Sequence, residues 1–387
     1  MGCLQILLAL VLASINASRV EAAKHSLIVG TFSTNFLYTV EYDDDNEALS
    51  LVAKSEVPAA SSWISLNNDA TKLYGTDWNA EEPSFVSYDV SDPRHIKHEA
   101  TIVAGRGCAG SKSVFVAARR TAPYTVYGSY YYGDDARCGT VLSVDGGGAL
   151  NGIVQNYTYA AGSAVHGTAF SPDERVLFSA DAAGNAIWTH AVDAASGAVV
   201  SPPLGRVAGP SAGSRPRHLA VHGSGRYVYA VLEGTSQVAQ YAVSETGDGG
   251  MLSFIHGAAV SLFPLLREGS ADADSAADFW ADEVALSAAG RYLWATNRAR
   301  DRGRRGYVSA FALEPSGAVV RQLFLRPTST SGGFANSVAP SRFDDAVAAL
   351  TDNATGLVQI WHVERGLVAS LDIEDGGGCC ANAVWLD

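Results

Sequence analysis

Apolar and polar residues alternate with a period of two over short segments along most of the chain, and turn-forming residues separate these segments. Such alternation predicts β-strands rather than helices. One seven-residue strand pattern, with Tyr or His at its fifth position and Val at its seventh, occurs at 84–90, 186–192 and 237–243. Looser copies centre on four further positions, Leu37, Val141, Val308 and Val358. Seven copies, spaced by about 46 to 70 residues, are typical of the four-stranded blades of a β-propeller.

Other strand patterns stand in a fixed order before these copies. A turn and a short alternating strand precede most of them, as in the near duplicates 225–230 and 290–295, and a short apolar segment comes earlier still. The last apolar segment, 383–386, has no partner strands after it, whereas 25–52 supplies strands that lack an innermost partner. Joining the two completes a seventh blade and leaves no exposed sheet edge. The predicted fold class is therefore all-β, a seven-bladed β-propeller closed by pairing of its N- and C-terminal strands.

The first residues have a different character. An apolar run from Leu4 to Leu12 is followed by small residues at 20–23, which predicts a secretory signal peptide over residues 1–22. A buried N-terminal strand is the alternative. The run is too short to span a bilayer, and no later segment is apolar for long enough, so we expect no membrane-spanning helix. Residues 23–387 are predicted to form a single propeller domain, secreted and glycosylated at the sequons of Asn156 and Asn353.

Cysteines and one long acidic segment add detail. Four cysteines follow the predicted leader. In an oxidising compartment Cys108 and Cys138 are the favoured disulfide pair, since one blade would hold both. Cys379 and Cys380 are adjacent, and both a vicinal disulfide and two free thiols stay open. The segment 245–282 is predicted to be an irregular surface excursion between blades, with solvated acidic residues.

The charge of the chain limits its partners. The formal net charge is −13 at pH 7, and an acidic surface disfavours nucleic acid and anionic lipid. It also disfavours an anionic small molecule unless arginine side chains reverse the potential locally. The sequence has no Gly-rich phosphate loop and no zinc-spaced Cys/His cluster. We therefore expect neither a metal nor a cofactor.

Blade geometry brings five distant residues to one face of the predicted ring. Strands alternate in direction within a blade, so the start of the innermost strand and the turn after the second strand share a face. His166, Arg217 and Asp282 start innermost strands, and Glu233 and Arg298 follow second strands. Two guanidiniums can each bind a carboxylate, and a carboxylic acid beside an imidazole can transfer a proton. This arrangement predicts a site for a small polycarboxylate.

Longer segments around these residues resemble the fungal 3-carboxy-cis,cis-muconate cyclase family of lactonase-type propellers. The similarity runs from His25 to Asp387. Its most specific segments are APYTVY at 122–127, VQNY at 154–157, VHG at 165–167, LFSAD at 177–181, PR at 216–217, LFLRPTSTSGG at 323–333 and NAVWLD at 382–387. Ungapped stretches of this kind are more specific than a blade pattern, which unrelated propellers share.

The resemblance implies a metal-independent cycloisomerase that closes 3-carboxy-cis,cis-muconate, or a related carboxylated muconate, to its lactone. The family's proposed catalytic His, Glu and two Arg match His166, Glu233, Arg217 and Arg298. We expect His166 and Glu233 to manage the proton, with their division of roles left open. Arg217, Arg298 and Asp282 are expected to bind the substrate. The expected partner is a small-molecule polycarboxylate, and the oligomeric state is left open.

Some features depart from the family. Phe334 stands where the family is expected to carry His, and 105–108 replaces a more polar segment. A secretory leader is unexpected, because aromatic catabolism through muconates is ordinarily intracellular. Two other functions therefore stay open. One is a secreted lactonase that hydrolyses a sugar-acid or related lactone, and the other is a non-catalytic propeller that binds a ligand or protein through the same rim.

Overall fold

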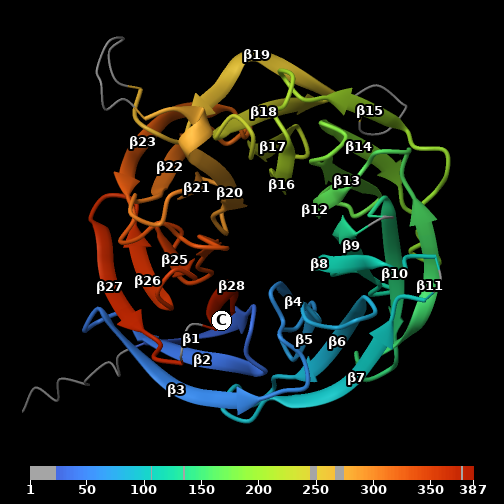
Figure 1. Ribbon diagram of the computed structural model, residues 1–387, viewed down its shortest axis with the longest axis horizontal. Coiled ribbons are helices and arrows are strands. Elements are labelled where there is room, and N and C mark those ends of the chain that lie inside the picture. Colours follow the sequence, from blue (N-terminus) through green and yellow to red (C-terminus); the bar gives the residue numbers. More distant parts are fainter. Residues whose placement is uncertain (1–22, 106, 134–135, 245–250, 266–273, 376–377) are drawn as a thin grey trace, which may run out of the picture.

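The computed structural model describes residues 23–105, 107–133, 136–244, 251–265, 274–375 and 378–387. Over these residues the strands form seven four-stranded antiparallel sheets, arranged as blades in a ring around one axis (Figure 1). The described part contains one short 3-10 helix, η1 (Ala276–Asp278). The predicted all-β, seven-bladed propeller is confirmed.

Each blade has the same order of strands from the axis outward. The innermost strands are β4 (Ile64–Leu66), β8 (Ser111–Ala118), β12 (Val165–Phe170), β16 (Pro216–Val221), β20 (Phe279–Leu286), β24 (Val338–Pro340) and β28 (Cys379–Trp385). The second strands are β5 (Lys72–Thr76), β9 (Val126–Gly133), β13 (Val176–Asp181), β17 (Tyr227–Leu232), β21 (Tyr292–Ala299), β25 (Val347–Asp352) and β1 (Lys24–Thr31).

The two outer layers of the blades follow the same plan. The third strands are β6 (Ser84–Asp89), β10 (Cys138–Val144), β14 (Ala186–Ala191), β18 (Gln237–Val243), β22 (Tyr307–Leu313), β26 (Leu357–His362) and β2 (Phe36–Asp43). The outermost strands are β7 (Lys97–Val103), β11 (Leu150–Thr158), β15 (Gly205–Ala208), β19 (Leu252–Ser261), β23 (Val319–Pro327), β27 (Gly366–Asp372) and β3 (Ala48–Glu56). All seven copies of the recurring sequence pattern are third strands.

The two ends of the described chain close the ring. β28 pairs antiparallel with β1, with Leu27 opposite Trp385 and Val29 opposite Ala383. The closing blade therefore takes its innermost strand from the C-terminal segment and its other three strands from the N-terminal segment (Figure 1). This pairing confirms the predicted closure and satisfies backbone groups that would otherwise form a free sheet edge.

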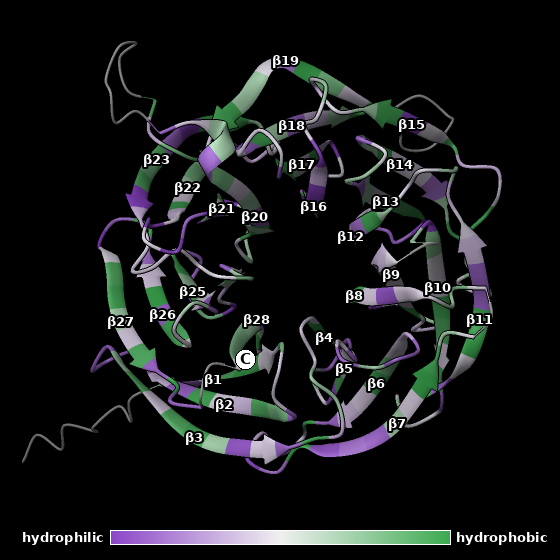
Figure 2. Cartoon of the chain, in the orientation of Figure 1, coloured by the Kyte–Doolittle hydropathy of each residue, from purple (hydrophilic) through white to green (hydrophobic). Residues whose placement is uncertain are grey.

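The hydrophobic core lies between neighbouring blades. One cluster, for example, joins Ile28 and Leu37 of the closing blade to Leu73 and Val86 of the next blade. Third strands are almost fully buried because a blade packs on each of their faces, whereas outermost strands alternate between exposed and half-buried positions. Figure 2 shows the difference for β7, which is mostly hydrophilic. This packing holds the innermost strands in place around the axis.

The prediction of one irregular excursion over 245–282 is wrong for the described residues. Leu252–Ser261 is the outermost strand β19, and β20 already begins at Phe279. The strand was missed because most of its residues are half-buried or exposed, so it carries little of the apolar alternation that marks the inner strands.

Two acidic residues after β19 form ion pairs, although the sequence predicted only solvated side chains here. Asp274 and Asp278 each lie 2.9 Å from Arg304. The remainder of this acidic segment, 245–250 and 266–273, lies outside the described residues, as does the predicted signal peptide at 1–22.

Two disulfides link the four described cysteines. The favoured pair Cys108–Cys138 is bonded, and it ties the segment before β8 to β10 of the same blade. Cys379 and Cys380 form the vicinal disulfide that the sequence had left as one of two alternatives. The second disulfide lies at the start of β28, the innermost strand of the closing blade.

Candidate active site

Five predicted site residues line one cavity near the starts of the innermost strands. His166, Arg217 and Asp282 come from β12, β16 and β20, which belong to three consecutive blades. Glu233 directly follows β17, and Arg298 lies near the end of β21. The structure therefore brings together side chains that are separated by more than a hundred residues along the chain. Their chemical roles stay predictions.

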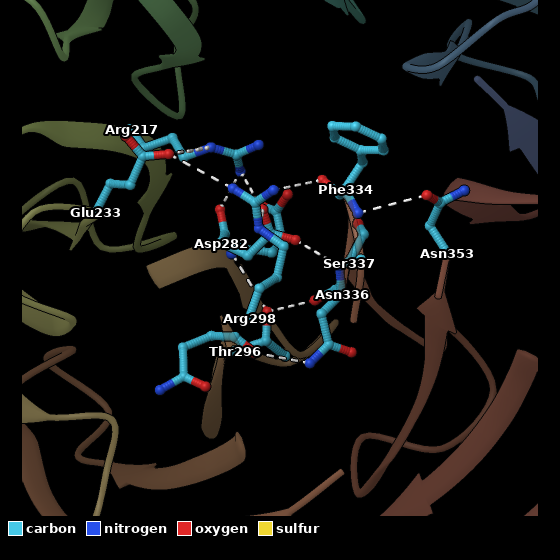
Figure 3. Close-up of polar contacts among 12 residues, drawn as sticks. Arg217, Glu233, Asp282, Thr296, Arg298, Phe334, Asn336, Ser337 and Asn353 are labelled. Atoms are coloured by element: carbon cyan, nitrogen blue, oxygen red, sulfur yellow. Dashed lines mark hydrogen bonds and ion pairs between the residues drawn. The ribbon is translucent and has the colours of Figure 1, made fainter. Parts of the chain in front are cut away.

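Asp282 is the centre of a buried charge cluster. Its Oδ1 atom lies 2.6 Å from Nη1 of Arg217 and 3.1 Å from Nε of Arg298. Its Oδ2 atom accepts a hydrogen bond from the backbone N–H of Asn336 at 2.5 Å. Burial works against the charged carboxylate, but the two guanidiniums hold the pKa of Asp282 below its ordinary value. Figure 3 shows how these groups surround the carboxylate.

Glu233 contacts three guanidiniums. Its Oε1 atom lies 3.6 Å from Nε of Arg217 and 3.5 Å from Nη2 of Arg298. Its Oε2 atom lies 3.1 Å from Nη2 of Arg215, a residue that the sequence reasoning missed although it stands two positions before Arg217. Three guanidiniums face the two carboxylates of Glu233 and Asp282. The cluster therefore has an excess of one positive charge in an otherwise acidic protein.

Protein oxygens orient the two central guanidiniums and leave one donor group free. Nη1 of Arg298 donates to the backbone carbonyl of Phe334 at 2.7 Å, and Nη1 of Arg217 donates to the carbonyl of Asp282 at 2.5 Å. Among the described residues, no group accepts a hydrogen bond from Nη2 of Arg217. This N–H₂ group is therefore available to a ligand carboxylate.

His166 is held at the edge of the cluster by a second histidine. Its Nδ1 atom lies 2.9 Å from Nε2 of His218, whose Nδ1 atom lies 2.8 Å from Oε2 of Glu283. The Nε2 atom of His166 has no hydrogen-bond partner within the described part of the chain. Burial and the neighbouring Arg217 lower the pKa of His166 well below its ordinary value, so its imidazole is neutral near pH 7. Sequence reasoning missed His218 and Glu283.

Aromatic side chains surround the opening of the cavity. The rings of Phe32 and Trp78 are 5.2 Å apart, those of Phe32 and Phe334 are 5.9 Å apart, and those of Trp78 and Tyr132 are 5.9 Å apart. Phe334 and Tyr132 are 62% and 51% exposed, unusually high values for large apolar rings. We call Phe32, Trp78, Tyr132 and Phe334 the aromatic rim.

The space for a ligand extends beyond the cavity itself. The cavity has a volume of about 50 Å³, which is enough for a few waters but not for a tricarboxylate. An adjoining cavity of about 350 Å³ shares Glu233, Arg298, Phe334 and Tyr132 with it. Arg300 also lines this larger space, with its guanidinium 4.7 Å from the ring of Trp280. A small polyanion would therefore occupy both cavities and contact guanidiniums in each.

Two further features of the described residues bear on function. In the described ranges, no group of three or more His, Cys, Asp or Glu side chains is placed to hold a metal ion. In the same ranges, no helix is long and apolar enough to cross a membrane. The predicted absence of a metal and of membrane segments stays an expectation.

Comparisons with known proteins agree with the fold. Residues 26–364 match the family model described as Lactonase, 7-bladed beta-propeller. The chain is 33% identical over 379 residues to carboxy-cis,cis-muconate cyclase of Neurospora crassa, covering 94% of this chain and 99% of the relative. It is 28% identical to muconate cycloisomerase 1 of Cutaneotrichosporon cutaneum over 88% of this chain and 91% of that protein.

Solved structures add support for the fold alone. The periplasmic gluconolactonase of Pseudomonas aeruginosa superimposes with a TM-score of 0.73 at 19% sequence identity, over 94% of this chain and 99% of that one. The family match covers most of the chain, and the sequence similarity to the Neurospora relative spans nearly all of it. The chain therefore belongs to the seven-bladed lactonase β-propeller family.

Proposed function

We propose that the protein is a cycloisomerase that closes 3-carboxy-cis,cis-muconate, or a related carboxylated muconate, to its lactone. Similarity to the Neurospora carboxy-cis,cis-muconate cyclase over nearly the whole chain supports this reaction. The observation that carries the proposal is the site itself. Oriented guanidiniums with excess positive charge lie beside a neutral imidazole whose Nε2 atom has no partner among the residues that the structure describes. Such a site binds a polyanion and supplies one proton, and lactone closure needs both.

The reaction joins two parts of one molecule. An oxygen of one substrate carboxylate forms a bond to a carbon of a C=C double bond, and the π electron pair moves to the neighbouring carbon. That carbon takes up one proton. Nη2 of Arg217 and the guanidinium of Arg298 bind the remaining carboxylates and stabilise the negative charge that develops on them. The side chain of Asp282 is almost fully buried behind the guanidiniums, so we assign it to orienting them rather than to contacting the substrate.

The geometry favours His166 over Glu233 as the proton donor. Both carboxylate oxygens of Glu233 contact guanidiniums, whereas Nε2 of His166 has no partner among the described side chains. We assign the proton of the neutral imidazole to Nε2 and the acceptor role in the contact with His218 to Nδ1. Glu233 then holds Arg215, Arg217 and Arg298 in position.

Turnover of 3-carboxy-cis,cis-muconate by the purified protein, followed by ultraviolet absorbance with and without a chelator, tests the proposal. We expect turnover that the chelator leaves unchanged. His166→Gln should lower kcat by about 10²–10⁴-fold, whereas Glu233→Gln should lower kcat/KM by about tenfold through loss of guanidinium orientation. Hydrolysis of a sugar-acid lactone without muconate turnover would favour the lactonase function. Binding of the muconate without any turnover would favour a non-catalytic propeller.

We also propose that the protein is secreted after cleavage of residues 1–22. The two disulfides among its described residues support an oxidising compartment. Glycosylation is expected to be easier at Asn353, whose amide nitrogen donates a long 3.3 Å hydrogen bond, than at Asn156, whose amide donates one of 2.8 Å. N-terminal sequencing and the mass change on deglycosylation of native protein test these points, and an intact Met1 would contradict them.

A further inference from the structure

A continuous chain of three buried side chains leads away from the proposed proton donor. Nδ1 of His166 lies 2.9 Å from Nε2 of His218, and Nδ1 of His218 lies 2.8 Å from Oε2 of Glu283. The three residues are 8%, 1% and 6% exposed. They come from β12, β16 and β20, so the chain crosses three neighbouring blades. Both distances are those of good hydrogen bonds, and each atom can donate or accept according to its protonation.

We propose that His218 and Glu283 are positioning residues that form a proton relay behind His166, in which Glu283 takes the negative charge left when His166 donates its Nε2 proton. This inference rests on the proposed cycloisomerase function and adds the source of its proton. His166 touches the substrate, whereas His218 and Glu283 act through it.

The surroundings of the relay keep it uncharged at rest. Burial and the nearby charge of Asp282 raise the pKa of Glu283 well above its ordinary value. Burial and the nearby charge of Arg217 lower the pKa of His218 well below its ordinary value. Asp282 and Glu233 oppose this lowering of the pKa of His218, whereas Arg298 lowers the pKa of both histidines. The remaining neighbours are aromatic, namely Trp63 and Phe115 against His218 and Tyr131 against His166.

Two contacts set the hydrogen-bond order of the uncharged relay. Oε1 of Glu283 accepts from the backbone N–H of Val284 at 3.1 Å, which leaves the acidic proton to Oε2. Nη1 of Arg217 lies 3.5 Å from Nδ1 of His218, and a guanidinium can only donate, so this Nδ1 atom is an acceptor. Protonated Glu283 donates to Nδ1 of His218, and Nε2–H of His218 donates to Nδ1 of His166. The proton of His166 is then on Nε2, the atom without a partner in the described structure. Both histidines are therefore Nε2–H tautomers in the resting protein.

The relay lets His166 donate without becoming an imidazolate. As the Nε2–H bond of His166 breaks and the new C–H bond forms, Nδ1 of His166 receives the proton from Nε2 of His218. Nδ1 of His218 receives the proton from Glu283, which becomes a carboxylate. Both imidazoles stay neutral, and one negative charge moves from the substrate carbon to Glu283. After product release, one proton from water returns to Nε2 of His166, and the same shifts in reverse restore the resting state.

Glu283 is well placed to carry this charge for a short time. It lines a second cavity of about 660 Å³, which is bordered by the far ends of the innermost strands, including Leu66, Ala118 and Leu286. A cavity of this size admits water, which stabilises a carboxylate. Arg217 acts on Glu283 in the same direction, because its charge favours the ionised form.

Glu283→Gln tests the relay, because glutamine keeps the hydrogen bond to His218 but has no acidic proton to give. We expect kcat to fall by about 10²-fold with KM nearly unchanged. We also expect the parent rate in H₂O/D₂O mixtures to depend on several transferred protons, and the variant rate to depend on fewer. Glu174→Gln is the matched control, since Glu174 is a buried glutamate that accepts backbone hydrogen bonds from Arg120 and Thr121 outside the relay. It should leave kcat and the isotope dependence unchanged.

The tautomers of the parent protein supply a second test that needs no turnover. ¹⁵N NMR of the imidazoles, assigned with His166→Gln and His218→Gln, should show both as neutral Nε2–H tautomers at pH 7. An Nδ1–H tautomer or an imidazolium at either position would overturn the relay, as would a Glu283→Gln variant with parental kcat. If the parent fails to turn over the muconate, the proposed function is wrong, but the tautomers still decide the hydrogen-bond order that the relay requires.

Discussion

Asp282 and Glu283 are consecutive carboxylates on β20, yet they behave in opposite ways. Both are buried, at 1% and 6% exposure. Asp282 faces two guanidiniums and has a lowered pKa, whereas Glu283 faces an imidazole and has a pKa raised well above its ordinary value. Burial alone would raise the pKa of both groups. The partner of each carboxylate, rather than its depth, therefore decides whether it is charged.

The neighbouring strand β16 carries one partner for each of these two carboxyl groups. On β16, Arg217 pairs with Asp282, and the next residue, His218, pairs with Glu283. Two networks therefore lie one residue apart along these strands. The charged network consists of Arg217, Arg298, Asp282 and Glu233, and the neutral network consists of His166, His218 and Glu283. We assign substrate binding to the charged network and proton transfer to the neutral one. A site with this separation can attract a polyanion without making its own proton donor an ion.

The largest expected effect comes from replacing one of these two carboxyl groups at a time by its amide. Asp282→Asn leaves two buried guanidiniums without their central anion and should lower the free energy of unfolding by about 3–5 kcal/mol. Glu283→Gln replaces one neutral group by another and should cost only about 1 kcal/mol. Urea unfolding of both variants at pH 7 measures the difference. Equal losses would mean that Glu283 is charged in the folded protein.

A smaller effect is expected from replacing a guanidinium of the charged network by the ammonium group of lysine. Arg217→Lys and Arg298→Lys keep the charge but lose the planar set of donors that contacts Asp282 and the substrate. Each should lower kcat/KM by about ten- to a hundredfold, which corresponds to about 1.5–3 kcal/mol. Steady-state kinetics on the muconate check this, with Arg206→Lys on outermost strand β15 as the control. If kcat/KM is unchanged in both variants, the two guanidiniums do not bind the substrate.

Part of this site could be predicted from the sequence, because equivalent positions in the blades of a propeller lie on the same face of the ring. The recurring third strand predicted seven blades, and the starts of innermost strands placed His166, Arg217 and Asp282 on one face. His218 and Glu283 were not predicted as site residues. In a regular strand, consecutive side chains point to opposite faces, so the neighbours of Arg217 and Asp282 were expected to point away from the site. The pairing register shifts in β16 and β20 at these residues, so two consecutive side chains of one strand meet two of the other. Such irregularities re-aim side chains beside active sites, and no residue pattern in the sequence marks them.

The members of the neutral network should change the pH dependence of stability in opposite directions. The lowered pKa values of His166 and His218 mean that stability is lost as the pH falls below their ordinary value of 6.5. The raised pKa of Glu283 acts oppositely, because its contribution is lost as the pH rises above its ordinary value of 4.5. Glu283→Gln removes this opposing contribution. The free energy of unfolding of the variant should therefore fall more steeply than that of the parent between pH 6.5 and 4.5, by about 1.4 kcal/mol per pH unit. Parallel urea titrations across this range measure the slopes, and identical slopes would contradict a protonated Glu283.

The smallest effect is expected at Phe334, whose side chain belongs to neither network. Its backbone carbonyl accepts from Arg298, but its ring is 62% exposed on the aromatic rim. Phe334→His keeps the backbone contact and adds a group that is partly cationic at pH 6. KM for the tricarboxylate should therefore fall by about two- to fivefold at pH 6, with kcat and the free energy of unfolding nearly unchanged. Phe334→Leu, which adds no charge, is the control and should not lower KM. Steady-state kinetics at pH 6 and 8 measure the effect, which should shrink at pH 8 as the imidazole loses its proton. A large change in kcat would instead show that the rim ring takes part in the chemistry and that the two buried networks do not account for it alone.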